Sequence, residues 1–520
     1  MPVLTAIDIL TVQRYIFSSK RLQDIISASW LVQWATDKDG ALIENRERVI
    51  YAGGGNALLE FDSIADARLF AGEYTRRLLE KAPGLEVVLE HEEFPRGKLA
   101  NAAQSILQKI AQAKLERTPS AEQLGLGVTA RCAMTGHPAN DLGPDGVPLS
   151  KMILALRDDE VQKSAKARWQ RFLPQSAGGA IDFPLQIDHL GRSYGDTSLL
   201  GVVHLDGNGV GRKIKEWLQG CTENGIPDDE VKRQYKEFSK GLEDIVEKTF
   251  RALVMRVCGS IKEGEVSGRI PEMKFKLKSE GITTFLPLRP IIVAGDEMTF
   301  LCDGRIALDL ATTALKIIER ETLPHLGPLT ASAGVALVRT HYPFQRAYEM
   351  AERLCAKAKA KRREMNDEGS WIDWHIGTAR PGLSIDDLRR NAYRAKSAYR
   401  AEVYWVLTCR PYRLGSGKDD VESWQWLTEA LLDSPSHGLR SGPWKNSKNK
   451  VKELMNIVRM GPDHAKKILQ AWQIREPSLR LVEELGDNGF LHLDRTPLLD
   501  AVEIIDIHLP LQENTEEVIS

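Results

Sequence analysis

The segment IIVAGDEMTF, residues 291–300, has the pattern of a buried β-hairpin with two acids at its tip. An apolar run ends at Gly295, the carboxylates of Asp296 and Glu297 follow, and a second apolar run then resumes. Gly and Asp are common turn residues, so the pattern is also compatible with ordinary turn chemistry. Two acids on a buried hairpin are costly, however, unless a cation neutralises them. We therefore interpret this hairpin as a candidate metal site.

A related segment without acids occurs earlier in the chain, IYAGGGNALLEF at residues 50–61. Placing Gly54 on Gly295 aligns Gly55 and Asn56 with the two acids, and a shift of one residue aligns Gly54 and Gly55 with them. In either register the earlier hairpin lacks both carboxylates. The chain thus has two hairpins of one kind, of which only the later one carries acids.

Each hairpin belongs to the same order of elements, which is strand, helix, hairpin, helix and strand. The first copy begins with a strand at 3–10, and the second begins with a strand at 199–206. We also expect a further strand at 126–131 and helix throughout the stretch 383–408. The repeat indicates an internal duplication of a ferredoxin-like unit, and hence an α+β fold.

The predicted domain organisation follows from this duplication. The stretch between the copies is rich in Pro, Gly and Asp, which is typical of a connector, and helical periodicity dominates after the second copy. We expect a first unit at 1–135, a connector at 136–198, a second unit at 199–380 and a helical C-terminal domain at 381–520.

Strand 199–206 ends in a third acid, Asp206. In an antiparallel sheet of this order the strand ends beside the hairpin tip, so we expect Asp206 near Asp296 and Glu297. Three carboxylates without His or Cys suit a hard ion such as Mg²⁺ or Mn²⁺. Two such ions about 3.5–4 Å apart can activate a hydroxyl and stabilise a leaving pyrophosphate. The acids therefore predict phosphoryl or nucleotidyl transfer.

A glycine-rich loop, GNGVGRK at 207–213, follows this third acid. Gly207, Gly209 and Gly211 leave backbone N–H groups free to approach phosphates, and the N-terminus of the next helix favours anions. Lys213 adds positive charge. We interpret the loop as a phosphate-binding segment.

The composition is that of an ordinary globular protein, with 520 residues, 42% hydrophobic and 27% charged, and a net charge of −2. This charge gives no global basic field for nucleic acid, although AKAKAKRR at 356–363 is a local basic patch. The six cysteines lack the spacing of a zinc knuckle or a redox pair. No apolar run reaches the roughly 18–20 residues that cross a bilayer. We expect reduced thiols, a cytoplasmic location and no membrane association.

Several motifs together resemble a known family. LDGNGVGRKI, RPIIVAGDEMTF, ASAGVALV and WIDWHI are similar to the second palm domain of the large polymerase-cyclase subunit of type III CRISPR effectors. VQRYIFSSKRLQDIISASWLV and YAGGGNALLEF are similar to the first, catalytically silent palm of that family. More distantly, the acidic hairpin resembles the GGDEF motif of diguanylate cyclases. The resemblance extends over roughly residues 1–380 in the order of the family.

This resemblance implies two palm domains packed face to face, followed by a helical C-terminal domain. It implies synthesis of cyclic oligoadenylates from ATP with two Mg²⁺ or Mn²⁺ ions, in an antiviral complex that binds guide RNA and target RNA through other subunits. Asp206, Asp296 and Glu297 would be the catalytic metal ligands. Lys359 would face the phosphates, with Lys357 as its neighbour. Further nucleotide contacts are expected from Gly207, Asn208, Gly209, Gly211, Lys213 and Gly295, and from Gly54, Gly55 and Asn56 of the silent palm.

The chain departs from the family pattern at several positions. Ala294 replaces a Gly, Glu297 replaces an Asp, and Asn208 stands where some members have an Asp. The first palm begins at the N-terminal strand, so we expect neither the HD nuclease domain of the family nor DNase activity. Cys132, with His137 nearby, stands in place of a zinc-binding cysteine cluster, and we expect no zinc.

Two other functions remain compatible with the sequence. A free-standing palm cyclase would work without a guide RNA and is favoured by the compact length. A non-enzymatic RNA-binding scaffold would retain the palm fold and is disfavoured by the intact acids. The Trp, Tyr, Lys and Arg residues after the second palm suit RNA stacking and helix packing equally well.

Overall fold

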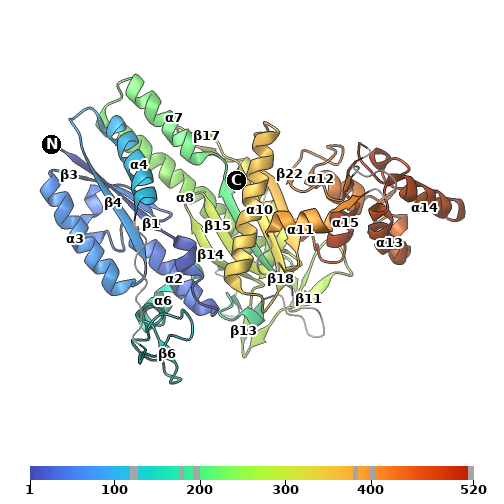
Figure 1. Ribbon diagram of the computed structural model, residues 1–520, viewed down its shortest axis with the longest axis horizontal. Helices are drawn as coiled ribbons and strands as arrows, with labels where there is room; N and C mark the ends of the chain where they lie inside the picture. The colour runs from blue at the N-terminus through green and yellow to red at the C-terminus, as the bar shows by residue number, and fades with distance from the viewer. Residues whose placement is uncertain are drawn as a thin grey trace.

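Two β-sheets lie side by side in the computed structural model, and long helices cover them (Figure 1). The C-terminal helices form a lobe at the end of the molecule farthest from the first sheet (Figure 1). The structure describes residues 1–117, 127–174, 181–190, 199–378, 384–396, 404–492 and 494–512. Within these ranges no helix is both long enough and apolar enough to span a membrane.

The first sheet is antiparallel and has the strand order β2-β3-β1-β4. Ser63 caps the helix that follows the hairpin, because its Oγ accepts from the N–H of Asp66 at 3.2 Å. The strands are β1 (Val3–Leu10), β2 (Val49–Gly53), β3 (Asn56–Phe61) and β4 (Glu86–Glu93). The helices of this part are α1 (Val12–Ile16), α2 (Leu22–Ala35), α3 (Ile64–Lys81) and α4 (Leu99–Glu116).

The second sheet repeats this order in four strands, β14-β15-β8-β18, and extends it with β19, parallel to β18, and with β22. In chain order both sheets thus run second, third, first and fourth strand, the order of a ferredoxin-like unit. The predicted α+β class is confirmed. The strands are β8 (Leu199–Gly207), β14 (Leu288–Ala294), β15 (Glu297–Asp303), β18 (Ala331–Arg339), β19 (Trp371–Ile376) and β22 (Tyr412–Arg413). The helices are α7 (Val210–Glu223), α8 (Asp228–Gly259), α9 (Ala307–Glu319) and α10 (Phe344–Glu364).

Shorter elements occupy the connector and the C-terminal part. The connector contains two helices, α5 (Lys151–Leu156) and α6 (Asp159–Gln170), rather than loop alone. The C-terminal part contains α11 (Ile385–Ala392), β20 (Arg394–Lys396), β21 (Tyr404–Val406), α12 (Trp424–Trp426), α13 (Lys448–Arg459), α14 (Pro462–Arg475) and α15 (Leu498–Ile504). Because β22 pairs with β19, a strand ladder joins this part to the second sheet.

Two sequence-based expectations are wrong. Of the strand expected at 126–131, residue 126 lies outside the described residues, and the rest contributes only an isolated bridge between Arg131 and Pro138, where turn residues prevent a longer ladder. The helix expected over 383–408 ends at Ala392, and β20 then pairs with β21, whose sequence YWV favours a strand. Residues 397–403 of that stretch lie outside the described residues.

Helix α10 packs unusually close to the central strands of the second sheet. A Cβ added at Gly334 of β18 would lie 1.9 Å from the carbonyl oxygen of Ala351 and 2.4 Å from the backbone nitrogen of Cys355. Only a residue without a side chain allows the backbones to approach so closely. Gly334 therefore determines how near α10, and every side chain it carries, comes to the end of β8.

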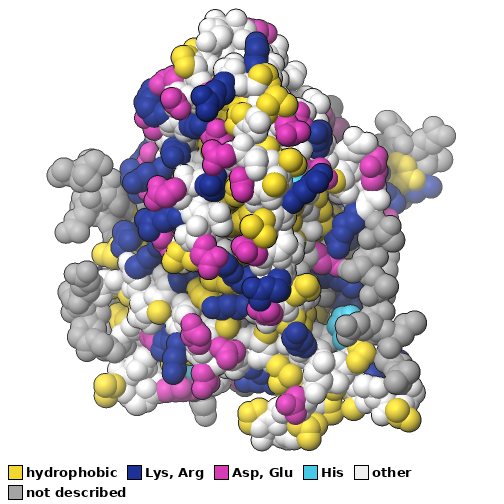
Figure 2. Space-filling model, turned by 90° about the vertical axis from the view of Figure 1, so that its left-hand side faces the viewer, with side chains coloured by type: hydrophobic (Ala, Val, Ile, Leu, Met, Phe, Trp, Pro, Cys, Tyr) yellow, Lys and Arg dark blue, Asp and Glu magenta, His cyan; other side chains and the backbone are white. Residues whose placement is uncertain are grey.

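The surface over the first sheet carries both signs of charge. Figure 2 shows Lys and Arg side chains interspersed with Asp and Glu across this face, with scattered apolar side chains between them. Exposed ion pairs such as Arg76–Glu80, at 2.9 Å along α3, account for part of this mixture. The mixture agrees with the small net charge of −2.

We expect Gly334→Ala to lower the free energy of unfolding by about 3 kcal/mol, because the new methyl group would clash with the backbone of α10. Gly72→Ala is the matched control. Gly72 is an exposed residue of α3 with open space around its Cα, so alanine should raise stability by roughly 0.5–1 kcal/mol. Urea unfolding followed by circular dichroism measures both. Equal midpoints for the two variants would contradict the packing argument.

Candidate active site

The hairpin of β14 and β15 turns through two residues, Gly295 and Asp296. Gly295 has a φ of 59°, a left-handed conformation that residues with side chains rarely adopt. Two-residue hairpin loops with glycine at the first position match the twist of the flanking strands. The local sequence therefore forms a tight turn with Asp296 at its tip and Glu297 as the first residue of β15.

The structure brings the three predicted acids to one end of the second sheet. Glu297 lies directly opposite Asp206 of β8, so these two side chains share a face. The N–H of Gly207 donates to the carbonyl oxygen of Asp296 at 3.0 Å. A Cβ added to Gly207 would lie 2.8 Å from the Cβ of Asp296, so Asp296 packs on the opposite face. Among the residues that the structure describes, no three His, Cys, Asp or Glu side chains group closely enough to hold one metal ion.

Lys359 of α10 neutralises Asp206. Its Nζ lies 2.7 Å from Oδ2 of Asp206 and donates to the carbonyl oxygen of Gly207 at 2.7 Å. A carboxylate and a carbonyl oxygen are ligands that hard divalent ions prefer. The ammonium group thus occupies oxygen ligands that would also suit Mg²⁺ or Mn²⁺. Glu297, which lies opposite Asp206 on the neighbouring strand, is next to them.

Burial and crowding raise the pKa of two of the acids. The pKa of Glu297 rises to about 8, chiefly because the carboxyl is buried, with added repulsion from Asp206 and Asp296. The pKa of Asp296 rises to about 6, again first by burial and then by Asp206, against the opposing charge of Lys359. A divalent cation bound here would offset this repulsion, so the electrostatics of the acids fit such an ion.

The carboxylate of Glu297 has neighbours that sequence analysis did not identify. The Tyr348 hydroxyl of α10 donates to it at 3.4 Å, and Nδ1 of His204 lies 3.6 Å from it. His204 also lies 3.0 Å from Oγ1 of Thr299, and burial lowers the pKa of its imidazole to about 4. His204 and Thr299 are each two residues from a predicted acid along a strand, and therefore on the same face. This spacing of two residues from a predicted acid is the feature of the sequence that could have identified both residues.

The glycine-rich loop after β8 is anchored by a buried asparagine. The side chain of Asn208 donates to Oγ1 of Thr330 at 3.1 Å and accepts from Oγ of Ser332 at 2.9 Å. Gly209, with a φ of 70°, is the N-cap of α7, and Gly211 in its first turn has open space around it. Asn208 thus holds the loop to the neighbouring strand, while the glycines leave the helix N-terminus accessible.

Two of the predicted nucleotide-binding lysines make other contacts. Lys213 donates to the carbonyl oxygen of Pro328. Lys357 forms an ion pair with Asp386 of α11, on the side of α10 opposite Lys359. The structure therefore brings Lys359, and not Lys357, to the acids.

The turn of the first hairpin meets the turn of the second. Gly54 and Gly55 form the turn of β2 and β3, with φ values of 61° and 84°. A Cβ added at Gly54 would lie 3.6 Å from the Cα of Gly295, so the two backbones are in contact. The side chain of Asn56 turns back to the carbonyl oxygen of Gly54 at 3.4 Å. The predicted acid-free surface therefore adjoins the acidic hairpin.

The first unit retains one acid that sequence analysis did not include. Asp8 of β1 lies opposite Asn56, in the register position that Asp206 has opposite Glu297. It forms an ion pair with Lys114 of α4. Burial raises the pKa of this carboxyl, and the ion pair opposes the rise.

The two ion pairs occupy equivalent places in the two units. Lys114 lies fifteen residues after Leu99, the first residue of α4, just as Lys359 lies fifteen residues after Phe344, the first residue of α10. Aligning Asp8 of strand 3–10 with Asp206 of strand 199–206 would have indicated this equivalence.

No protein-family model matches the chain, and no curated protein matches its sequence. Solved structures do match it. Csm1 of T. onnurineus matches with a TM-score of 0.55 at 15% identity, over 98% of this chain and 70% of that one. An apo Csm1–Csm4 cassette matches with a TM-score of 0.53 at 14% identity, over 97% and 70%. The cassette in complex with AMPPNP matches with a TM-score of 0.52 at 13% identity, over 97% and 69%.

The chain has the Csm1 fold. Csm1 proteins are subunits of type III CRISPR complexes, so the resemblance inferred from the sequence motifs is confirmed at the level of the fold. The Csm1 fold extends over nearly the whole chain, including the part after the second sheet.

With a chelator present, we expect the free energy of unfolding to fall as the pH rises from about 5 to 8. The folded protein keeps Asp296 and Glu297 protonated at pH values at which the unfolded chain releases those protons, so stability is lost across this window. Glu297→Gln should reduce the total loss of unfolding free energy across this pH window by on the order of 1–3 kcal/mol. Glu73→Gln, which changes an exposed carboxyl of α3, is the control. Chemical unfolding at several pH values measures the slopes, and identical slopes for wild type and Glu297→Gln would refute the expectation.

Proposed function

We propose that the chain is a metal-dependent nucleotidyltransferase that makes cyclic oligoadenylates from ATP, as the large subunit of a type III CRISPR-like, RNA-guided antiviral complex. The observation that carries this proposal is the contact between the turns at Gly54 and Gly295, with hairpin acids on one side only. In addition, Csm1–Csm4 cassettes of this fold have been solved with AMPPNP, with one ATP and with cA3.

The oxygen ligands of the second unit support magnesium or manganese as cofactor. Asp206, Asp296 and Glu297, with the carbonyl oxygen of Gly207, would hold two divalent ions. Bound ions would neutralise the leaving pyrophosphate and lower the pKa of the attacking hydroxyl. The raised pKa values of Asp296 and Glu297 support this assignment, because burial and mutual repulsion destabilise the charged carboxylates and a bound cation would stabilise them.

Lys359 and the loop after β8 would orient the triphosphate. The ammonium group of Lys359 is carried on a flexible stem, so it can move from Asp206 to a phosphate oxygen when divalent ions bind the acids. The N-terminus of α7, with Gly209 and Gly211, leaves N–H groups exposed to the same phosphates. The donor nucleotide would therefore lie between α7 and α10.

The first hairpin would receive the acceptor nucleotide. Gly54 and Gly55 present backbone without side chains, which leaves room beside the acidic hairpin. Asn56 is neutral where the second unit has Glu297, and Lys114 neutralises Asp8. The first unit thus lacks the negative charge that would repel a nucleotide.

One observation favours a second candidate, an RNA-binding scaffold without activity. In the part of the chain that the structure describes, no three potential metal ligands group together, and Lys359 already neutralises Asp206. The two candidates differ in whether product forms. A cyclase that acts alone would differ from a complex subunit in needing no RNA-bound partner.

We expect incubation with ATP and Mg²⁺ or Mn²⁺ to yield cyclic oligoadenylates when an RNA-bound partner subunit is present. A chelator should abolish the product, because the acids alone cannot neutralise pyrophosphate. Mass spectrometry of the products measures this. Product without the partner would identify a free-standing cyclase. Absence of product under every condition would support the RNA-binding scaffold without activity.

We expect Asp206→Ala to lower synthesis by about a thousandfold or more, because an ion that neutralises the transferring phosphates loses its anchor. Its melting temperature should be equal or slightly raised, the usual result when a strained functional site is relieved. Asp8→Ala removes the equivalent acid of the first unit and is the matched control, which should retain most activity. If Asp8→Ala abolished synthesis while Asp206→Ala retained it, the catalytic and silent units would be reversed.

A further inference from the structure

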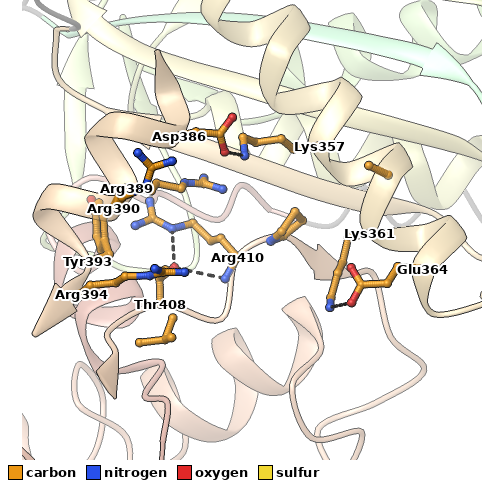
Figure 3. A pocket seen from close by; sticks show the side chains of 13 residues that line it. Lys357, Lys361, Glu364, Asp386, Arg389, Arg390, Tyr393, Arg394, Thr408 and Arg410 are labelled. Atoms are coloured by element: carbon orange, nitrogen blue, oxygen red, sulfur yellow. Dashed lines mark hydrogen bonds and ion pairs between the residues drawn. The ribbon is translucent and has the colours of Figure 1, made fainter. Parts of the chain in front are cut away.

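A basic cavity lies between α10, α11 and the segment 406–411 (Figure 3). Its volume is about 370 Å³, within the usual range of small-ligand pockets. No acid of the hairpin is among its lining residues. Six cationic side chains line it against two acidic ones, and the cationic residues are Lys357, Lys361, Arg389, Arg390, Arg394 and Arg410.

Two buried arginines are held rigidly at this cavity. The Nε of Arg410 lies 3.0 Å from Oδ1 of Asp500, its Nη1 donates to the carbonyl oxygen of Trp374 at 3.1 Å, and its guanidinium lies 4.5 Å from the ring centre of Tyr393. Arg389 is also mostly buried, its guanidinium forms an ion pair with Asp373, and its buried Nε has no hydrogen-bond partner. Asp500 and Asp373 thus hold both guanidinium groups in fixed orientations at the wall of the cavity.

The exposed cationic side chains are available to a ligand. Lys361 pairs with Glu364 at 2.9 Å and Arg390 pairs with Asp387 at 3.1 Å, each within one turn of its own helix. Such exposed pairs contribute little stability, so an incoming anion can replace their carboxylates. The guanidinium of Arg394 has no ion-pair or hydrogen-bond partner among the described residues, although it lines the cavity. The cavity thus offers one cation without a partner and two cations whose carboxylate partners an incoming anion can replace.

A second cavity, of about 450 Å³, adjoins the first and shares Lys361, Thr408 and Arg410 with it. Together they exceed the space that a single small anion needs. Arginine side chains bind phosphate groups through two parallel N–H···O bonds, and several cations around one cavity can bind more than one phosphate group. The ligand class that suits the charge and the size is therefore a phosphorylated compound of nucleotide size.

We infer that this cavity binds the phosphate groups of a nucleotide at a site separate from the hairpin acids. Lys357 and Lys361 project from the side of α10 opposite Lys359, so the same helix separates the two sites. The inference is independent of the proposed synthesis, because it uses none of the acids and no divalent ion.

Isothermal titration calorimetry of the full chain with pyrophosphate and with ADP, both in a chelator, tests the inference. The chelator excludes metal-dependent binding at the acids. We expect saturable binding that the double variant Arg390→Glu with Arg394→Glu weakens by about tenfold or more, since both removed cations line the cavity. The double variant Arg68→Glu with Arg96→Glu changes two exposed arginines of the first unit by the same total charge, and it should bind as wild type does. Asp206→Ala should also bind normally.

A single-stranded oligonucleotide without terminal phosphates distinguishes the source of the phosphate. Tighter binding of ADP than of the oligonucleotide assigns the site to a free nucleotide, and the reverse assigns it to the backbone of a strand. Unchanged melting temperatures show that the variants are folded, and Lys361→Gln provides a milder second variant. Absence of saturable binding, or equal binding by wild type and both cavity variants, would overturn the inference.

Discussion

The contact between the turns at Gly54 and Gly295 determines how closely the two duplicated units approach at their hairpin tips. Both glycines have positive φ values, and neither has a side chain that would separate the backbones. The acidic hairpin of the second unit and the neutral turn of the first are therefore in direct contact. A two-site reaction between nucleotides requires this juxtaposition, because both reactants must be held in one orientation at one place.

The two units have kept the same framework and diverged in charge. Each has an aspartate near the end of its first strand and pairs it with a lysine at the same position of the helix after the fourth strand. The difference lies in the residue across the ladder, which is Asn56 in one unit and Glu297 in the other. One lysine neutralises one aspartate, so the extra carboxylates of the second unit remain uncompensated. Burial is the chief cause of their raised pKa values, and repulsion between the acids adds to it.

Helix α10 carries basic side chains to two different places. Gly334 lets the helix lie against the sheet, and Lys359 then reaches Asp206. Lysines two residues away on either side project from the opposite face, toward α11 and the C-terminal part. The basic run AKAKAKRR is therefore not one patch, since the helical period divides it between two sites.

The duplicated order of elements, the α+β class and the acids at the end of one sheet were predictable from the sequence, because period-two strands, glycine turns and helix patterns are local signals. It did not indicate β20 and β21, because their pairing depends on contacts that local periodicity does not encode. Three further facts were visible only in the folded chain: Asp296 packs on the opposite face from Asp206 and Glu297, Asp8 pairs with Lys114, and Arg410 and Arg394 line one cavity. These facts depend on which distant segments meet, and that is decided by packing rather than by any short stretch of residues.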